Sequence, residues 1–102
     1  MYDCAKAAHR KINAYAAVFM EQAAGHKGEM LGAIEIMRGR IGTKTPHSFP
    51  ELSAAAGEIA AAFWNPVTAA YAYCQREQRH IVATAIAQTL DRLVILLERE
   101  NG

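Results

Sequence analysis

The amino-acid sequence predicts an all-α protein, a small bundle of three to four helices that ends in a long carboxyl-terminal helix. Apolar residues recur with a period near 3.6 through most of the chain, which is typical of amphipathic helices. Alanine, the strongest helix former, supplies much of the 52% hydrophobic content. Glycine and proline are confined to a few short stretches that can serve as turns. The length of 102 residues suits one domain, which we take to span residues 1–102.

The first helix is expected between Asp3, which can cap its amino end, and Gly25, a residue that commonly follows a helix. A second, shorter helix is expected from about Glu29 to Gly39, where apolar residues again recur at helical spacing. A single kinked helix through the sequence GHKG is the alternative, because a glycine inside a helix costs only about 1 kcal/mol relative to alanine.

A third helix is expected after the one clear loop, the sequence GTKTPHSFP at residues 42–50. Ser48 and Glu51 are three residues apart and can form a capping box, with Pro50 in the first helical turn. The buried face of this helix is expected to include residues 52, 55, 56, 59 and 63.

The last helix is expected to be the longest, because no glycine or proline occurs from Val67 to Asn101. Asn65 can cap it and Pro66 can take its first position, although Pro66 could instead kink a helix that continues through it. The polar sequence QREQRH, residues 75–80, is interpreted as a solvated collar on this helix. About 34 residues at 1.5 Å each give about 51 Å, whereas a compact domain of this size is roughly 33 Å across. The helix must therefore bend or project towards a partner.

The carboxyl-terminal half of this helix predicts an interface. Its apolar residues occupy most of the helix circumference, more than one hairpin can cover, so we expect a homodimer or a groove filled by a client protein. A tryptophan at the expected helix junction is interpreted as a core anchor or, if exposed, as a binding hot spot. Two arginines near the second helix could contact an acidic partner. The predicted partner-binding residues are Trp64, Leu93, Val94, Ile95, Leu97, Arg38 and Arg40.

Charge and composition argue against several classes of protein. A formal net charge of +1, from 11 basic and 10 acidic residues, lacks the basic excess of nucleic-acid binders. The longest apolar runs, IAAAFW and LVILL, are too short to cross a bilayer, and the amino-terminal residues lack the apolar stretch of a signal peptide. Without an export signal, Cys4 and Cys74 are expected to be free thiols in the reducing cytoplasm.

Two short patterns point to alternative chemistry. Glu77 and His80 share a helix face at the spacing of one half of a di-iron site, and a symmetric dimer could supply the second half. The sequence HKG at residues 26–28 resembles the histidine phosphotransfer domains, small helical bundles with an exposed phosphorylated histidine. This resemblance implies that His26 carries the phosphoryl group and that Lys27 is its electrostatic partner, although the family places two residues between them.

A third pattern concerns the single tryptophan. Trp64, together with the Tyr73-x-x-x-Glu77 spacing, resembles the WXG100 proteins, which are secreted helical hairpins of about this length. The resemblance implies a tryptophan at the junction of two helices. Here Asn and Pro follow the tryptophan, in place of the family's x-Gly.

The pattern of residues favours protein binding over catalysis. No Ser-His-Asp or Cys-His arrangement is legible, so no enzyme activity and no cofactor or metal are expected. The leading expectation is a small cytoplasmic regulatory protein, a dimeric inhibitor or adaptor of bacterial or phage type that masks a target protein.

Overall fold

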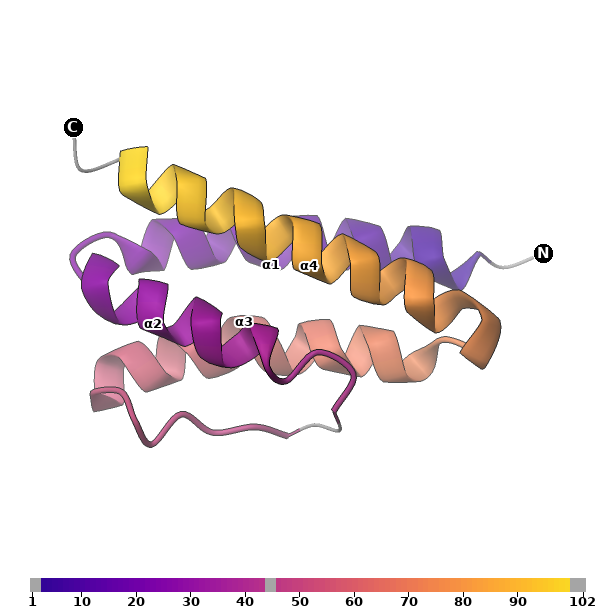
Figure 1. Ribbon diagram of the computed structural model, residues 1–102, viewed down its shortest axis with the longest axis horizontal. Helices are drawn as coiled ribbons and strands as arrows, with labels where there is room; N and C mark the ends of the chain where they lie inside the picture. Colours follow the sequence, from indigo (N-terminus) through magenta and orange to yellow (C-terminus); the bar gives the residue numbers. More distant parts are fainter. Residues whose placement is uncertain (1–2, 44–45, 100–102) are drawn as a thin grey trace.

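The computed structural model describes residues 3–43 and 46–99, and these fold into a bundle of helices without strands (Figure 1). The four helices are α1 (Cys4–Ala23), α2 (Lys27–Arg38), α3 (Ala54–Tyr73) and α4 (Arg76–Arg99). α1 packs most extensively against α3 and α4, while the shorter α2 lies against α3 and α4. The prediction of a small all-α bundle is confirmed.

The first two helices follow the local signals in the sequence. The side chain of Asp3 accepts a hydrogen bond from the backbone N–H of Lys6 at 3.0 Å, which caps α1. Gly25 has a φ of +92°, in the left-handed region that favours glycine, and the chain turns there. α2 is therefore a separate helix that begins at Lys27, and the single kinked helix is wrong.

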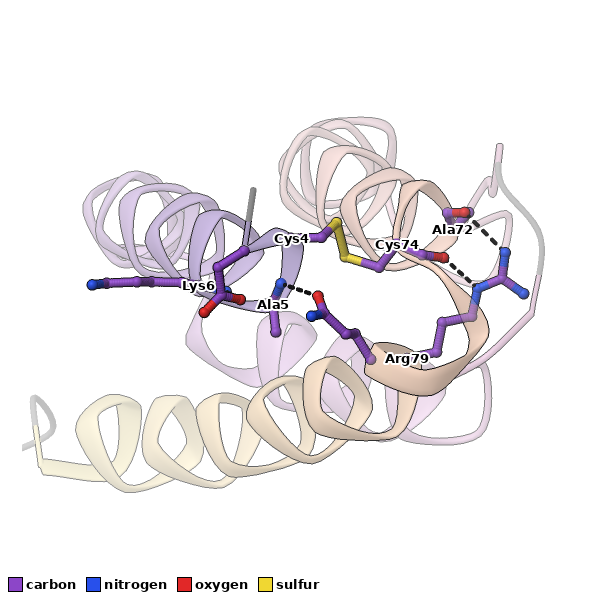
Figure 2. Close-up of a disulfide and its surroundings, with 8 residues drawn as sticks. Cys4, Ala5, Lys6, Ala72, Cys74 and Arg79 are labelled. Atoms are coloured by element: carbon purple, nitrogen blue, oxygen red, sulfur yellow. Dashed lines mark hydrogen bonds between the residues drawn. A yellow bond between two sulfur atoms is a disulfide. The ribbon is translucent and has the colours of Figure 1, made fainter. Parts of the chain in front are cut away.

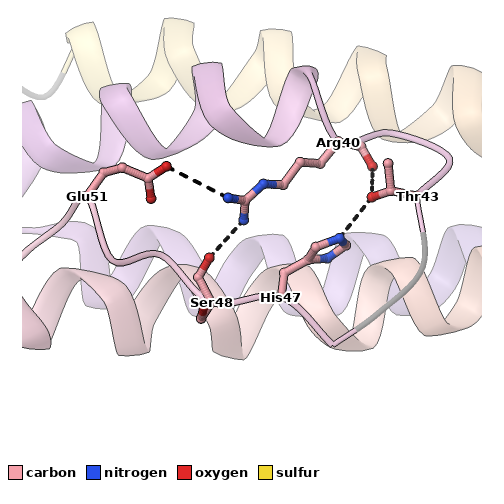
Figure 3. A network of polar contacts seen from close by, with 5 residues as sticks. All are labelled: Arg40, Thr43, His47, Ser48 and Glu51. Atoms are coloured by element: carbon pink, nitrogen blue, oxygen red, sulfur yellow. Dashed lines mark hydrogen bonds and ion pairs between the residues drawn. The ribbon is translucent and has the colours of Figure 1, made fainter.

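The described part of the segment between α2 and α3, residues 39–43 and 46–53, lies along the bundle (Figure 1), and we call it the strap. Arg40 organises its described part (Figure 3). The guanidinium donates to the carbonyl of Ser48 at 2.8 Å, lies 3.8 Å from the carboxylate of Glu51, and sits 4.9 Å from the centre of the Phe49 ring. Phe49 is buried beneath these contacts and anchors the strap to the core, while most other described residues of the strap are exposed or half-buried.

α3 begins later than the sequence predicts, and the capping box at Ser48 is wrong. The capping residue is Ser53, whose Oγ accepts from the N–H of Ala56 at 3.3 Å. Ser53 also donates from its backbone N–H and from Oγ to the carboxylate of Glu29, at 2.8 and 2.9 Å. A contact from α2 thus selects one of two serines that are both suited to a cap.

The helix boundary predicted at residues 64–66 is also absent, because α3 continues through Pro66. Proline cannot donate a backbone hydrogen bond, which weakens the helix at this point. The hydroxyl of Thr68 donates to the carbonyls of Trp64 and Asn65, at 3.0 and 3.2 Å, and so supports the backbone beside the proline.

The single long helix predicted from residue 66 to about residue 99 is wrong as well. The chain leaves the helix at Cys74, which is extended (φ −76°, ψ 152°), and α4 begins at Arg76. Arg79 holds this turn by donating to the carbonyls of Cys74 and Ala72, at 2.9 and 3.1 Å (Figure 2). Residues 75–80 are thus the end of a turn and the start of α4, not a collar on a continuous helix.

Cys4 and Cys74 form a disulfide, so the prediction of two free thiols is wrong (Figure 2). Because α1 and α3 run antiparallel, the first residue of α1 lies beside the residue that follows α3. Their Cα atoms are 5.6 Å apart although 70 residues separate them in the sequence. This distance is typical of disulfides.

The core is continuous between the helices. Its largest side chain is Trp64, which is fully buried, and the rings of Phe19 and Phe63 meet with centroids 5.2 Å apart. Among the described helices, α4 is the one whose length and apolar composition would suffice to cross a membrane, a property that core helices share. The lack of a long uninterrupted apolar run therefore does not by itself exclude a membrane span.

Candidate functional site

The residues predicted to bind a partner through the carboxyl-terminal helix are largely covered by this chain itself. Leu93 and Leu97 are fully buried, Val94 is partly buried, and only Ile95 is exposed, at 51%. The prediction assumed a hairpin, whereas the turn at Cys74 lets α4 pack against α1 and α2 as well. The apolar surface that called for a second chain is therefore already buried.

The other three predicted residues do not extend that surface. Trp64 is buried in the centre of α3, which confirms the interpretation as a core anchor. Arg38 contacts Glu35 at 3.3 Å and Asp91 on α4 at 2.6 Å, while Arg40 is engaged within the strap. The structure does not bring the seven residues together as one site.

A different surface emerges between α1 and α3. Two of the large exposed hydrophobic side chains, Tyr15 and Val18, project from α1 next to α3. Beside them an open hollow of about 500 Å³ is lined mainly by residues of α3, two of which, Ala55 and Ala62, are small. We call this surface the α1–α3 face. Its hollows are lined in part by Cys4 and by the buried residues Ala8, Phe19, Phe63 and Ala70, and we define the face by the other lining residues. They are Ala7, Lys11, Tyr15, Val18 and Gln22 of α1 with Ala55, Glu58, Ile59, Ala62 and Tyr73 of α3.

Helical spacing explains why these residues share one face. Residues 7, 11, 15, 18 and 22 of α1 follow one another at intervals of three or four, as do residues 55, 59 and 62 of α3. Across its 20 residues, α3 carries only one charged residue, Glu58. On α1, Lys11 is the one charged residue that lines these hollows. The α1–α3 face is therefore apolar and nearly uncharged, which is typical of the centre of a protein interface.

The exposed hydrophobic residues of α4 have a different setting. Ile81 and Ile95 are each 51% exposed, but the helical neighbours of Ile95 are the charged residues Asp91, Arg92, Glu98 and Arg99. Isolated apolar residues of this kind are ordinary on protein surfaces. They provide controls for experiments on the α1–α3 face.

The structure also locates the residues of the alternative patterns. In residues 3–43 and 46–99, no group of three or more His, Cys, Asp or Glu is placed to hold a metal ion. His26 lies in the turn before α2 and makes no capping hydrogen bond with its side chain. Tyr73 ends α3 and Glu77 lies in the first turn of α4, with Trp64 in the middle of α3. The hairpin implied by the WXG100 resemblance is therefore wrong.

Comparisons with known proteins found no matching family model, no matching curated protein and no matching solved structure. The function must be argued from the molecule alone. The α1–α3 face had one sequence signal, the scarcity of charge along residues 54–73. Periodicity concealed it, because residues 55 and 59 fall in the apolar stripe that predicts the buried face of the third helix.

Proposed function

We propose that this chain is a protein-interaction module that forms a homodimer through the α1–α3 face. The observation that carries the proposal is the gathering of exposed apolar side chains on a nearly uncharged surface that spans two helices. A contiguous apolar patch exposed to water is costly, and in stable proteins such patches usually mark interfaces. The sequence also predicts a homodimer, but it predicts an interface on α4, whereas we now propose an interface on α1 and α3.

The size of the face is compatible with a specific dimer. Two helices of 20 residues are each about 30 Å long, and side by side they present roughly 600 Å². Two such faces bury about 1,200 Å² in total, which lies at the lower end of specific protein interfaces.

The shape of the face supports a two-fold axis parallel to the helices. Such an axis sets α1 of each copy against α3 of the other. The ridge formed by Tyr15 and Val18 then meets the small side chain of Ala62 in the second copy, because Ala62 lies at the same height along the bundle. Large residues opposed to small ones allow close packing without voids. Because each copy supplies both the ridge and the hollow, the interface is complete with two chains.

The role proposed for the dimer is regulatory, an inhibitor or adaptor that binds and masks another protein. A disulfide such as Cys4–Cys74 is most common in oxidising compartments. This feature favours a protein that meets an oxidising environment over the permanently cytoplasmic protein expected from the sequence.

The test of the homodimer is the mass of the protein in solution. Val18→Asp places a charge in the centre of the α1–α3 face, so we expect light scattering to show a shift from dimer to monomer with the helical content retained. Ile81→Asp is the matched control, because Ile81 is at least as exposed as Val18, at 51% against 45%. A wild-type protein that stays monomeric at all concentrations, or a Val18→Asp variant that stays dimeric, would show that the proposal is wrong.

One further variant compares this face with the interface predicted from the sequence. Ile95→Asp changes the exposed residue of the predicted carboxyl-terminal interface. We expect this variant to remain dimeric. If Ile95→Asp gives a monomer and Val18→Asp does not, α4 is the interface and the α1–α3 face is not.

A further inference from the structure

A small open hollow lies directly beside the disulfide, at the end of the bundle where α1 begins. Cys4, Ala7, Ala8, Lys11, Ala70 and Tyr73 line it. The two cysteines differ in their access to this hollow. Cys4 lines it and is half-buried, whereas Cys74 is only 1% exposed and does not line it. Cys4 is therefore the cysteine that a thiol from solvent can approach through this hollow.

We propose that Cys4 is a site of reversible S-thiolation by a small thiol that carries carboxylates, and that Cys74 is the buried thiol released by this exchange. The incoming thiolate attacks Sγ of Cys4 and forms a new S–S bond with it. The Cys4–Cys74 bond breaks, and its electron pair leaves with Sγ of Cys74 as a thiolate. One disulfide is consumed and one is formed, so the step needs no oxidant or reductant beyond the thiol itself.

The surroundings of Cys74 suit a leaving group. Cys74 lies immediately before the amino end of α4, where the unpaired N–H groups of the helix favour negative charge. The Arg79 guanidinium is fixed at the same turn through its hydrogen bond to the Cys74 carbonyl. The amino end of α4 favours a thiolate at this position, and a stabilised thiolate leaves faster from a disulfide.

Charge at the hollow determines which thiols are favoured. Lys11 lines the hollow and provides a positive charge for the carboxylates of an incoming thiol. No acidic residue lines the hollow among the described residues, and the carboxylate of Asp3, which precedes Cys4, accepts from the N–H of Lys6 as the cap of α1. The hollow therefore favours an anionic thiol over a neutral one.

The two sulfurs remain neighbours after the exchange, which makes the modification reversible. The backbone N–H of Ala5 donates to Oε1 of Gln78 at 2.9 Å and ties the start of α1 to α4. Arg79 holds the turn at Cys74 through two carbonyls (Figure 2). The Cys74 thiolate is thus kept beside Cys4, where it can attack the mixed disulfide, expel the small thiol and restore the original bond.

The experiment maps the adduct formed with glutathione, an anionic thiol. The oxidised full-length protein is incubated with reduced glutathione, quenched with acid, and analysed by peptide mass spectrometry. We expect the Cys4 adduct to exceed the Cys74 adduct by about tenfold or more, as for attack on one sulfur only. Equal adducts, an excess at Cys74, or two free thiols in the untreated protein would each overturn the proposal.

A charge reversal tests the role of the hollow. We expect Lys11→Glu to slow the reaction with glutathione by about threefold or more and to leave the reaction with neutral 2-mercaptoethanol unchanged. Lys6→Glu is the matched control, because Lys6 lies on the same helix, five residues before Lys11, but does not line the hollow. If the two variants react alike, or if Lys11→Glu slows both thiols equally, the hollow does not select the thiol.

The proposed thiol exchange rests on the monomer and does not require the proposed homodimer, although a dimer would cover part of the hollow. The mapping is therefore performed on the wild-type protein and on Val18→Asp. We expect the Cys4 adduct in both, with a faster reaction in the variant if the dimer forms. A monomeric wild type would overturn the dimer alone, whereas an adduct distributed over both cysteines would overturn the exchange alone.

Discussion

Two buried ring nitrogens, one on His47 and one on Trp64, lack hydrogen-bond partners among the described residues where the strap meets α3. The hydroxyl of Thr43 donates to the carbonyl of Arg40 at 2.6 Å, so it must accept the hydrogen bond from Nε2 of His47 at 2.8 Å (Figure 3). His47 Nδ1 then carries a lone pair. This atom and the Nε1–H of Trp64 are both buried and unpaired among the described residues, with ring centroids 6.3 Å apart.

Protonation of His47 should therefore loosen the strap. A second N–H on the imidazole would be a buried donor without an acceptor among the described residues. The new charge would also lie near Arg40, whose carboxylate partner is Glu51 at 3.8 Å. Burial, and after it the positive charge of Arg40, holds the pKa of His47 below its ordinary value. The folded state thus favours the neutral form of His47. The contribution of His47 to the free energy of unfolding is therefore fully present above about pH 6.5, the ordinary pKa of histidine, and is lost as the pH falls towards the lower pKa of the folded state.

Denaturant unfolding, followed by the fluorescence of the single tryptophan, checks this prediction. We expect the free energy of unfolding to fall between about pH 7 and pH 5, and His47→Gln to remove part of that fall. A variant with the same pH dependence as the wild type would show that His47 is not the responsible group. The tryptophan is a direct reporter, because Trp64 packs beside His47.

At the scale of the helix, the start of α3 shows how a tertiary contact chooses between two local signals. Ser53→Ala removes the cap and both hydrogen-bonding roles of its hydroxyl, and we expect it to cost about 0.5–2 kcal/mol. Ser48→Ala is the control, because the contact of Ser48 is through its backbone carbonyl and should cost nothing measurable. Urea unfolding measures the stability of both variants. If Ser48→Ala loses more free energy of unfolding than Ser53→Ala, α3 begins at the predicted capping box and not at Ser53.

At the scale of the whole molecule, the disulfide closes most of the chain into one loop. It joins residues separated by 70 positions, and the loss of entropy in the unfolded chain corresponds to about 4 kcal/mol of stability. We expect the Cys4→Ala, Cys74→Ala double variant to lose a comparable free energy of unfolding while it keeps its helical content. Reductant should lower the stability of the wild type to that of the variant and leave the variant unchanged. A wild type insensitive to reductant would contradict the assignment.

The sequence by itself determined the features that a helix and its own flanking residues control. The all-α class follows from periodicity and alanine content, the start of α1 from the side chain of Asp3, and the break between α1 and α2 from the left-handed backbone of Gly25. Each of these signals acts within one helical turn. The residue that causes each of these structural features therefore lies within a few positions of the feature, so the feature can be predicted from the local sequence.

Only the tertiary structure decided the features that depend on residues far apart in the chain. Glu29 selects Ser53 as the cap of α3, and Arg79 together with the disulfide to Cys4 holds a turn that no glycine or proline marks. The same turn lets α4 bury Leu93 and Leu97 within the bundle, so that the α1–α3 face is left exposed in their place. An apolar stripe shows that a residue can be buried, but whether it is buried depends on which helices pack beside it.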